Sequence, residues 1–356
     1  MGLRIGLLPF PKKLPRGFTG GDGVVHRMIA EALAGSGHTL VPIPLDDPRL
    51  RIRRGLGRLL GTVALGYRTS PDGEFDVLLA NGETHVSTDH PRVLYLSHLS
   101  FARYRRQLGL RGWKGIARFL HLTRLAWAQW IHLRGKRVIA VSEYLRENLE
   151  AAGIPVHRVI TNAADTERFA PPPAGSPRGG LLYAGGYARI GKGFDILEAL
   201  ARKGHPIHCL TNQDPGPSLT WIQSVPYEQM PDFFRRHSLL VFPSRYESLG
   251  MVALEAMACG TPVVMGPVGV GMDLAREIPD FIIHGWDTNA VEEYDARIRK
   301  ILGRFDHYSA LARDYVVERH PPERFIRAWR DLFDQLEGER AAKGAASRRG
   351  EDRPAP

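Results

Sequence analysis

Short apolar runs alternate with helical patterns along most of the chain, separated by Gly, Pro and polar residues. Such runs are typical of strands that are covered on both faces of a parallel sheet. We predict strands at 3–10, 75–80, 93–97, 138–141, 156–160, 181–184, 207–211, 239–242 and 263–265. Helices are predicted at 24–34, 194–200, 227–237 and 251–259, and after 143 and 272. The alternation predicts an α/β protein with two doubly wound, Rossmann-like domains around a cleft.

The two halves meet in a polar, proline-rich segment at 161–175. We place an N-terminal domain at 1–163 and a C-terminal domain at 164–312. Large apolar residues at helical spacing predict a helix at 313–337 that packs back across both domains. The tail 338–356 lacks large apolar residues, so we expect it to be disordered. The arginine-rich segment 47–68 has no clear period, and no structure is predicted for it.

The stretch 241–265 combines a strand, a loop, a helix and a second strand, and it contains two glutamates. Glu247 falls in the loop and Glu255 in the helix, with Gly250 permitting a tight turn between them. Their separation corresponds to about 12 Å at the helical rise. Carboxylates accept hydrogen bonds from vicinal hydroxyls, so the pair suits a sugar joined through a diphosphate to a ribose. Two solvated glutamates beside an amphipathic helix are the alternative, which spacing alone favours.

Length and composition indicate a globular protein with two cores. The chain has 356 residues, of which 43% are hydrophobic. It contains no apolar run of about 18 residues, and the apolar N-terminal run is too short for a signal sequence. Cys209 and Cys259 both lie in apolar segments, which predicts reduced thiols and a cytoplasmic location.

The net charge of +10 is concentrated in one part of the chain. No Asp or Glu occurs between His90 and Ser142, where Arg and Lys are interspersed with Phe, Tyr, Trp and Leu. This mixture suits an anionic membrane surface, and a solvated basic face over a core helix is an equal alternative. A nucleic-acid partner is not expected, because no motif of a nucleic-acid-binding module is present. We therefore name 101–137 as a candidate surface for peripheral membrane contact.

Three further positions suit a cleft between the domains. His98 follows a predicted strand, where its near-neutral pKa suits proton handling or phosphate contact. Lys192 lies in a glycine-rich loop before a helix, a place where its charge can neutralise a diphosphate. Gly20 and Gly21 lie between a strand and a helix, where backbone amides can approach a ligand closely. A structural histidine, a surface lysine and a plain loop are the respective alternatives.

Cofactor and metal motifs are not found in the sequence. A GxGxxG followed by an acidic residue at dinucleotide-fold distance is missing from both halves, which argues against a dehydrogenase. His85, His90 and His98 lie close in sequence, but no Cys or carboxylate cluster completes a metal site. We therefore expect no cofactor and no metal.

The run PSRYESLGMVALEAMACGTPVV at 243–264 resembles the GT-B glycosyltransferases of the GT4 type, whose hallmark is Glu, seven residues, Glu. The segment TNAADTERF and the glycine-rich loop before Val24 are also similar to that family. Leu249 stands where many relatives have Phe, and Ala163 and Ala164 replace the usual Gly and Val. Gly186 occupies the place of an expected arginine, for which Arg189 is the candidate substitute.

The resemblance implies a GT-B fold and assigns roles to site residues. Glu247 and the amides of Leu249 to Met251 hold the sugar, and Glu255 binds the ribose diol. The implied catalytic residues are Glu247, Lys192 and His98. The implied donor-binding residues are Glu255, Arg189, Gly186, Ser248, Leu249, Gly250, Met251, Gly20 and Gly21.

The function implied by the resemblance is retaining, metal-independent transfer of a hexose-type sugar from a nucleoside diphosphate sugar to a glycan, lipid-linked or small-molecule acceptor. Two alternatives remain open. One is a GT-B sugar-nucleotide epimerase or phosphorylase. The other is a non-catalytic basic protein of the membrane surface. The expected location is cytoplasmic, with peripheral contact to the inner face of the membrane.

Overall fold

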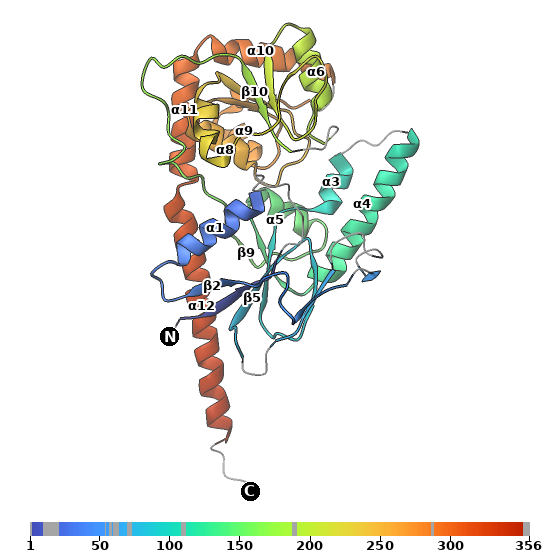
Figure 1. Cartoon of the computed structure of the whole chain (residues 1–356), viewed down its shortest axis with the longest axis vertical. Coiled ribbons are helices and arrows are strands. Elements are labelled where there is room, and N and C mark those ends of the chain that lie inside the picture. The colour runs from blue at the N-terminus through green and yellow to red at the C-terminus, as the bar shows by residue number, and fades with distance from the viewer. Residues whose placement is uncertain are drawn as a thin grey trace.

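The computed structural model describes residues 2–9, 21–53, 55–56, 59, 64–69, 73–107, 112–186, 191–285 and 288–351. Two α/β domains lie one above the other (Figure 1), each built on a parallel sheet flanked by helices. The predicted fold class is thereby confirmed. Within the described residues, no helix is both long and apolar enough to cross a bilayer.

The N-terminal sheet has the strand order β2-β1-β5-β7-β8-β9. Its strands are β1 (Arg4–Leu7), β2 (Thr39–Pro42), β5 (Val77–Asn81), β7 (Val93–Ser97), β8 (Arg137–Ala140) and β9 (Arg158–Val159). All its pairings are parallel. The helices α1 (Gly21–Leu33), α3 (Phe101–Gln107), α4 (Gly112–Leu133) and α5 (Glu143–Glu150) belong to this domain. Helix α1 begins at Gly21, earlier than the predicted residue 24.

A small second sheet joins β3 (Leu50–Ile52), β4 (Ala64–Tyr67) and β6 (His85–Thr88). β3 and β4 lie in the arginine-rich segment for which no structure was predicted, and β6 lies outside that segment. The β3–β4 pairing is antiparallel and the β4–β6 pairing is parallel. In β4 every residue is buried, whereas β3 exposes Arg51 and Ile52. The exposed edge accounts for the weak periodicity in the sequence.

The C-terminal sheet has the order β12-β11-β10-β13-β14 and is also parallel. Its strands are β10 (Leu181–Ala184), β11 (Ile207–Leu210), β12 (Thr220–Ile222), β13 (Leu239–Phe242) and β14 (Val263–Met265). Its helices are α6 (Phe194–Arg202), α7 (Met230–Arg235), α8 (Met251–Ala258), α9 (Gly271–Glu277), α10 (Val291–Leu302) and α11 (Phe305–Arg319). A 3₁₀ turn, η1 (Tyr227–Gln229), precedes α7 within the single helix predicted there.

The C-terminal end of the chain differs from the prediction. Residues 313–319 continue α11, whose Tyr315 and Val316 pack in the C-terminal core. The helix that returns to the N-terminal domain is α12 (Pro322–Glu351), which buries Trp329 and Phe333 in the N-terminal core.

Helix α12 also passes the boundary at 338, where a disordered tail was predicted. Ion pairs compensate for the missing apolar contacts. Glu339 pairs with Arg137 at 2.8 Å, and Arg340 pairs with Asp76.

Candidate active site between the domains

The loop between β13 and α8 carries Glu247 to the boundary of the two domains. Gly250 has φ +95° at the start of α8, a conformation that favours glycine. From Ala253 to Ala258 every residue of α8 is buried, and the helix packs against α7, α11 and the sheet. The loop therefore projects from a helix that is fixed on nearly all sides.

A cavity of about 250 Å³ lies beside this loop and is lined by both domains. Val25, His98, Val141 and Asn162 come from the N-terminal domain. The C-terminal domain contributes Ala184, Gly185, Gly186, Lys192, Phe242, Glu247, Ser248, Leu249, Gly250, Met251 and Val252. We call this space the Lys192–Glu247 cavity, because the Lys192 ammonium forms an ion pair with the Glu247 carboxylate there. The structure thus brings together the three residues predicted as catalytic.

The loop of Lys192 packs directly against the loop of Glu247. Gly193 has φ +69°, and a Cβ at this position would lie 2.2 Å from the Pro243 carbonyl oxygen. The amide of Arg245 donates to the Gly191 carbonyl at 2.9 Å. Its guanidinium donates twice to the Asp195 carboxylate, at 2.9 and 2.6 Å. Arg245 is only 8% exposed, so this bidentate pair holds the two loops together.

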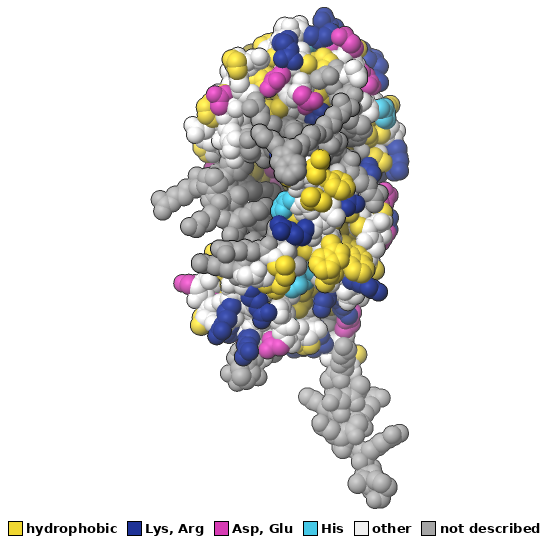
Figure 2. Space-filling model, turned by 90° about the vertical axis from the view of Figure 1, so that its right-hand side faces the viewer, with side chains coloured by type: hydrophobic (Ala, Val, Ile, Leu, Met, Phe, Trp, Pro, Cys, Tyr) yellow, Lys and Arg dark blue, Asp and Glu magenta, His cyan; other side chains and the backbone are white. Residues whose placement is uncertain are grey.

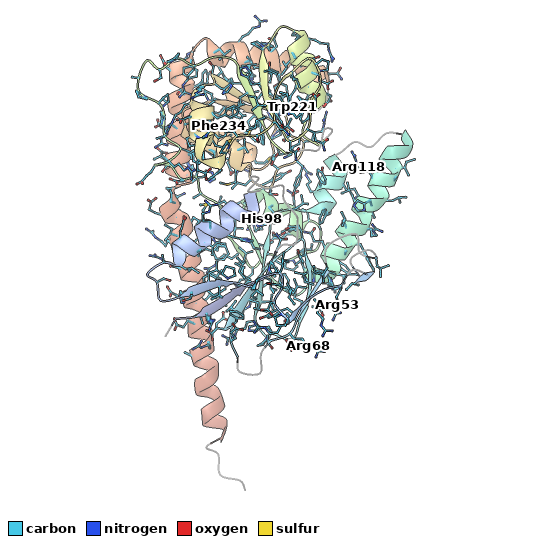
Figure 3. The ribbon with its side chains drawn as sticks, in the orientation of Figure 1. Arg53, Arg68, His98, Arg118, Trp221 and Phe234 are labelled. Atoms are coloured by element: carbon cyan, nitrogen blue, oxygen red, sulfur yellow. The ribbon has the colours of Figure 1, made fainter. Side chains whose placement is uncertain are left out.

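His98 lies at the upper end of the N-terminal domain, facing the C-terminal domain (Figure 3). Glu83 fixes the backbone of this segment. Its Oε1 accepts hydrogen bonds from the amides of His98 and Leu99, both at 2.8 Å, and from the Ser97 hydroxyl at 3.1 Å. These charge-assisted bonds position His98 at the cavity.

Residues on both sides of Glu247 contact the N-terminal domain. The Ser248 hydroxyl donates to the His98 carbonyl, and the Ser142 hydroxyl donates to the Ser248 carbonyl. The Tyr246 hydroxyl accepts from the Ser100 amide at 2.8 Å. Because Tyr246 is buried at the boundary, the loop of Glu247 belongs to the contact surface of both domains.

Glu255 lines a second cavity, of about 390 Å³, which shares Met251 with the first. We call it the Tyr227–Glu255 cavity. The Tyr227 hydroxyl donates to Glu255 Oε1 at 3.2 Å, and the Arg168 guanidinium lies 4.6 Å from the centre of the Tyr227 ring. Glu255 is 6% exposed, and burial raises its pKa to about 7, against the opposing effects of Tyr227 and Arg168. The interpretation of Glu255 as a solvated surface residue is therefore wrong.

The remaining predicted donor residues have different outcomes. Gly186, Ser248, Leu249, Gly250 and Met251 line the Lys192–Glu247 cavity. Gly21 is the first residue of α1. Gly20 and Arg189 lie outside the described residues.

The turn between β14 and α9 contains Gly266, Gly269 and Gly271, and close packing requires glycine at the last two of these positions. A Cβ on Gly269 would lie 2.4 Å from the Leu249 carbonyl oxygen, and one on Gly271 would lie 2.2 Å from the Gly266 carbonyl oxygen. The Val270 amide donates to the Leu249 carbonyl at 2.7 Å. These contacts support the Glu247 loop from the side of α9.

The part of the chain that the structure describes contains one group with metal-ligand spacing: His38, Asp334 and Glu337. It joins α12 to the N-terminal domain, and none of its three residues lines either cavity. His38 Nδ1 accepts from the Leu3 amide at 3.0 Å, and Nε2 lies 3.0 Å from Asp334. These contacts give the group a structural role in holding α12.

Sequence reasoning did not find Glu83, Arg245, Asp195 or Tyr227. Arg245 lies within the run that carries the family resemblance, but its partner Asp195 is in another segment. The only sequence signal for Glu83 is that an acidic residue precedes a strand. That signal is too general to assign a role. Tyr227 was placed on a helix with no chemistry attached to it.

Two family descriptions match this chain. Residues 208–306 match "Glycosyl transferases group 1", and residues 19–168 match "Glycosyltransferase Family 4". A D-inositol 3-phosphate glycosyltransferase of Geodermatophilus obscurus is 38% identical over 96 residues, covering 27% of this chain. The match spans 21% of that relative's length, and a second D-inositol 3-phosphate glycosyltransferase is matched over the same share. The chain thus spans about a fifth of the length of these curated relatives.

Solved structures resemble the fold over nearly the whole chain. Sucrose-phosphate synthase from Thermosynechococcus elongatus has a TM-score of 0.62 at 18% identity, covering 97% of this chain and 100% of that one. Anabaena HepE in complex with UDP-glucose has a TM-score of 0.60 at 14% identity, covering 94% and 100%. At these identities the likeness establishes the fold.

Proposed function

Because this chain belongs to the GT4-type glycosyltransferases of the GT-B fold, we propose that it transfers a hexose-type sugar from a nucleoside diphosphate sugar, with retention of anomeric configuration. The acceptor class is a glycan, a lipid-linked molecule or a small molecule. The observation that carries the proposal is the Lys192–Glu247 ion pair in a cavity between the domains, next to the buried Glu255. The UDP-glucose bound by the Anabaena neighbour supports a nucleotide sugar as donor.

The donor spans the two cavities in this proposal. Its diphosphate replaces Glu247 as the ion-pair partner of the Lys192 ammonium. The released carboxylate then accepts hydrogen bonds from the sugar hydroxyls. The amides of Leu249 to Met251 point the sugar toward the N-terminal domain. Ionised Glu255 accepts hydrogen bonds from both hydroxyls of the ribose. Met251 lines both cavities, so the two spaces are adjacent.

Transfer breaks the bond between the anomeric carbon and the diphosphate oxygen, and the electron pair leaves with the diphosphate. Lys192 stabilises that developing negative charge, so the proposal needs no metal ion. The acceptor hydroxyl attacks from the side of the leaving group, and its proton passes to the departing oxygen. His98, at the same cavity, orients the sugar or the phosphate. Attack on this face retains the anomeric configuration.

We also propose a cytoplasmic location with peripheral contact to the inner face of the membrane through 101–137. Helices α3 and α4 carry this segment, and α3 lies beside the site, since Tyr104 packs against Tyr246 with ring centres 5.4 Å apart. A membrane on this side brings the cavity near lipid-linked acceptors.

A thermal-shift screen with nucleotide sugars tests the donor, and mass spectrometry with candidate acceptors tests transfer. We expect stabilisation by one class of nucleoside diphosphate sugar, transfer that persists in EDTA, and an NMR spectrum with the donor's anomeric configuration in the product. Conversion of the sugar nucleotide without an acceptor indicates an epimerase, and dependence on inorganic phosphate indicates a phosphorylase. A protein that no nucleotide stabilises is not an enzyme of this class.

A further inference from the structure

Helix α4 carries an apolar stripe on its outer face. Ile116, Leu120, Trp127 and Ile131 are 53%, 62%, 58% and 44% exposed. At the helical repeat these four residues fall within about 60° of one another. Leu122, Leu125, Gln129 and His132, on the opposite face, are buried. The stripe is therefore an apolar face that the rest of the described chain leaves uncovered.

The surroundings of this stripe are basic. Arg124 falls on the same outer side of α4, and Arg134 directly follows the last residue of the helix. Both residues are exposed. No acidic residue occurs from 91 to 141. Figure 2 views the molecule from the side on which α4 lies, and it shows hydrophobic side chains gathered beside Lys and Arg side chains. Apolar and cationic groups on one exposed face are the combination that binds anionic bilayers.

A polar cavity of about 560 Å³ opens at the foot of α4. Ile131, the last residue of the stripe, lines it, so the cavity continues the apolar face. Its permanent cations are Arg92, Lys136 and Arg137, and its one carboxylate is Glu339, which pairs with Arg137 at 2.8 Å. Among the described residues, Arg92 and Lys136 have no ion-pair partner. Arg137, and to a smaller extent Arg92, lower the pKa of Glu339. Three cations thus face one carboxylate, and the excess positive charge is left to a ligand.

His132 and His85 form part of the wall without adding charge. Burial lowers the pKa of His132 to about 3, and burial with the nearby Arg53 lowers the pKa of His85. His132 Nε2 accepts from the Val86 amide at 3.3 Å. These neutral rings shape the cavity while Arg92 and Lys136 supply the attraction for an anion.

We propose that this cavity, with Arg92 and Lys136, binds the phosphate of an anionic phospholipid while the α4 stripe enters the apolar layer of the same membrane. The continuity of the cavity with Ile131 is what favours a lipid over a soluble phosphorylated molecule. The inference deepens the membrane contact proposed for 101–137 by naming its ligand. It rests on the proposed sugar transfer only for its purpose, which is to hold the interdomain cleft at a membrane that carries the acceptor.

Vesicle co-sedimentation of the full chain tests the surface, with phosphatidylcholine alone or mixed with phosphatidylglycerol. We expect binding to the anionic vesicles. Replacing the two cations (R92Q/K136Q) should weaken partitioning about 30-fold. Each of the two charges near an anionic surface strengthens membrane binding by about fivefold, and the two factors multiply. The matched control is R202Q/R276Q, which removes two exposed cations from the C-terminal domain and should have little effect. Leu120→Gln should weaken binding about tenfold, against an unchanged Leu302→Gln control.

Three outcomes overturn the inference: equal binding to neutral and anionic vesicles, equal loss in R92Q/K136Q and its control, or no vesicle binding at all. A titration with soluble glycerol phosphate separates the other source. Binding that is lost in R92Q/K136Q, without vesicle binding, assigns the cavity to a soluble ligand. Thermal shifts with nucleotide sugars, measured on the same variants, are independent of these results. A failed vesicle assay with intact donor binding therefore rejects only the membrane surface, and the reverse result rejects only the donor.

Discussion

The Lys192–Glu247 cavity and the Tyr227–Glu255 cavity each contain a glutamate, but the two glutamates have opposite surroundings. Glu247 pairs with a cation, so its charge is balanced within the site. Glu255 is buried, meets a hydroxyl, and has a pKa raised to about 7. In the proposed function the first cavity exchanges one ion pair for another, and in the second a carboxylate that ionises near neutral pH accepts hydrogen bonds from the ligand's hydroxyl groups. Identical residues in one short stretch are thus separated in role by their surroundings alone.

The largest expected effect comes from removing the cation of the first cavity. Lys192→Ala should lower kcat about 100- to 1,000-fold, the loss typical of one donor that stabilises a departing anion. Steady-state kinetics with the donor identified by the screen measures it. Lys203→Ala, which removes an exposed lysine paired with Glu292 at 2.7 Å, is the control and should leave kcat unchanged.

A double variant distinguishes two roles of Lys192: neutralising Glu247 and stabilising the departing diphosphate. In K192A/E247Q no unpaired carboxylate remains in the cavity. The reference is Glu247→Gln alone, because Glu247 also holds the sugar in the proposal. If Lys192 serves only to neutralise Glu247, the double variant turns over as fast as Glu247→Gln, and the proposed role of Lys192 is wrong. We expect the double variant to be slower than Glu247→Gln.

The second prediction concerns stability and depends on Glu255. Its pKa rises from 4.5 in the unfolded chain to about 7 in the folded one, so between these values the folded protein binds more protons. Folding stability therefore falls as pH rises through this window, by about 3 kcal/mol in total. Glu255→Gln removes this dependence. Urea denaturation of both proteins across the window measures the difference, and parallel curves contradict the prediction.

Burial explains why the strands of the two sheets could be predicted from sequence. β7, β10, β13 and β14 have the predicted bounds, because strands covered on both faces must be continuously apolar. β12 was missed because it lies at the sheet edge, with Thr220 and Trp221 exposed. No element was predicted for 291–302 or 305–312, where α10 and the first part of α11 lie.

The same logic divides the candidate site. Lys192, Glu247, Glu255 and His98 lie next to strand ends or helix starts, where local pattern and family resemblance identify them. The residues that hold them act across long sequence separations, as in the hydrogen bonds from Ser100 to Tyr246 and from Tyr227 to Glu255. Periodicity carries no information on such pairs. Nor did it reveal that Glu255 faces the protein interior, because α8 is apolar nearly all round.

The third prediction turns the comparison into a pH profile of binding. If only ionised Glu255 accepts the ribose hydroxyls, donor affinity rises with pH and levels off above about 7. The Kd of the nucleotide sugar should increase about tenfold from pH 8 to pH 6. A sugar diphosphate diester has no group that titrates in this range, so the change belongs to the protein. Isothermal titration calorimetry measures it, and Glu255→Gln should give a weaker affinity that does not vary with pH.

The smallest expected effect comes from removing the Tyr227 hydroxyl, which donates a hydrogen bond to Glu255. Tyr227 donates to the carboxylate and so lowers its pKa, in opposition to burial. Tyr227→Phe should raise that pKa by about one unit, which leaves fewer sites ionised at pH 7 and weakens donor binding about fivefold there. At pH 9 the carboxylate is ionised in both proteins, so their affinities should converge. A loss that persists at pH 9 means that Tyr227 contacts the donor itself, and the second cavity then recognises its ligand by more than the charge of Glu255.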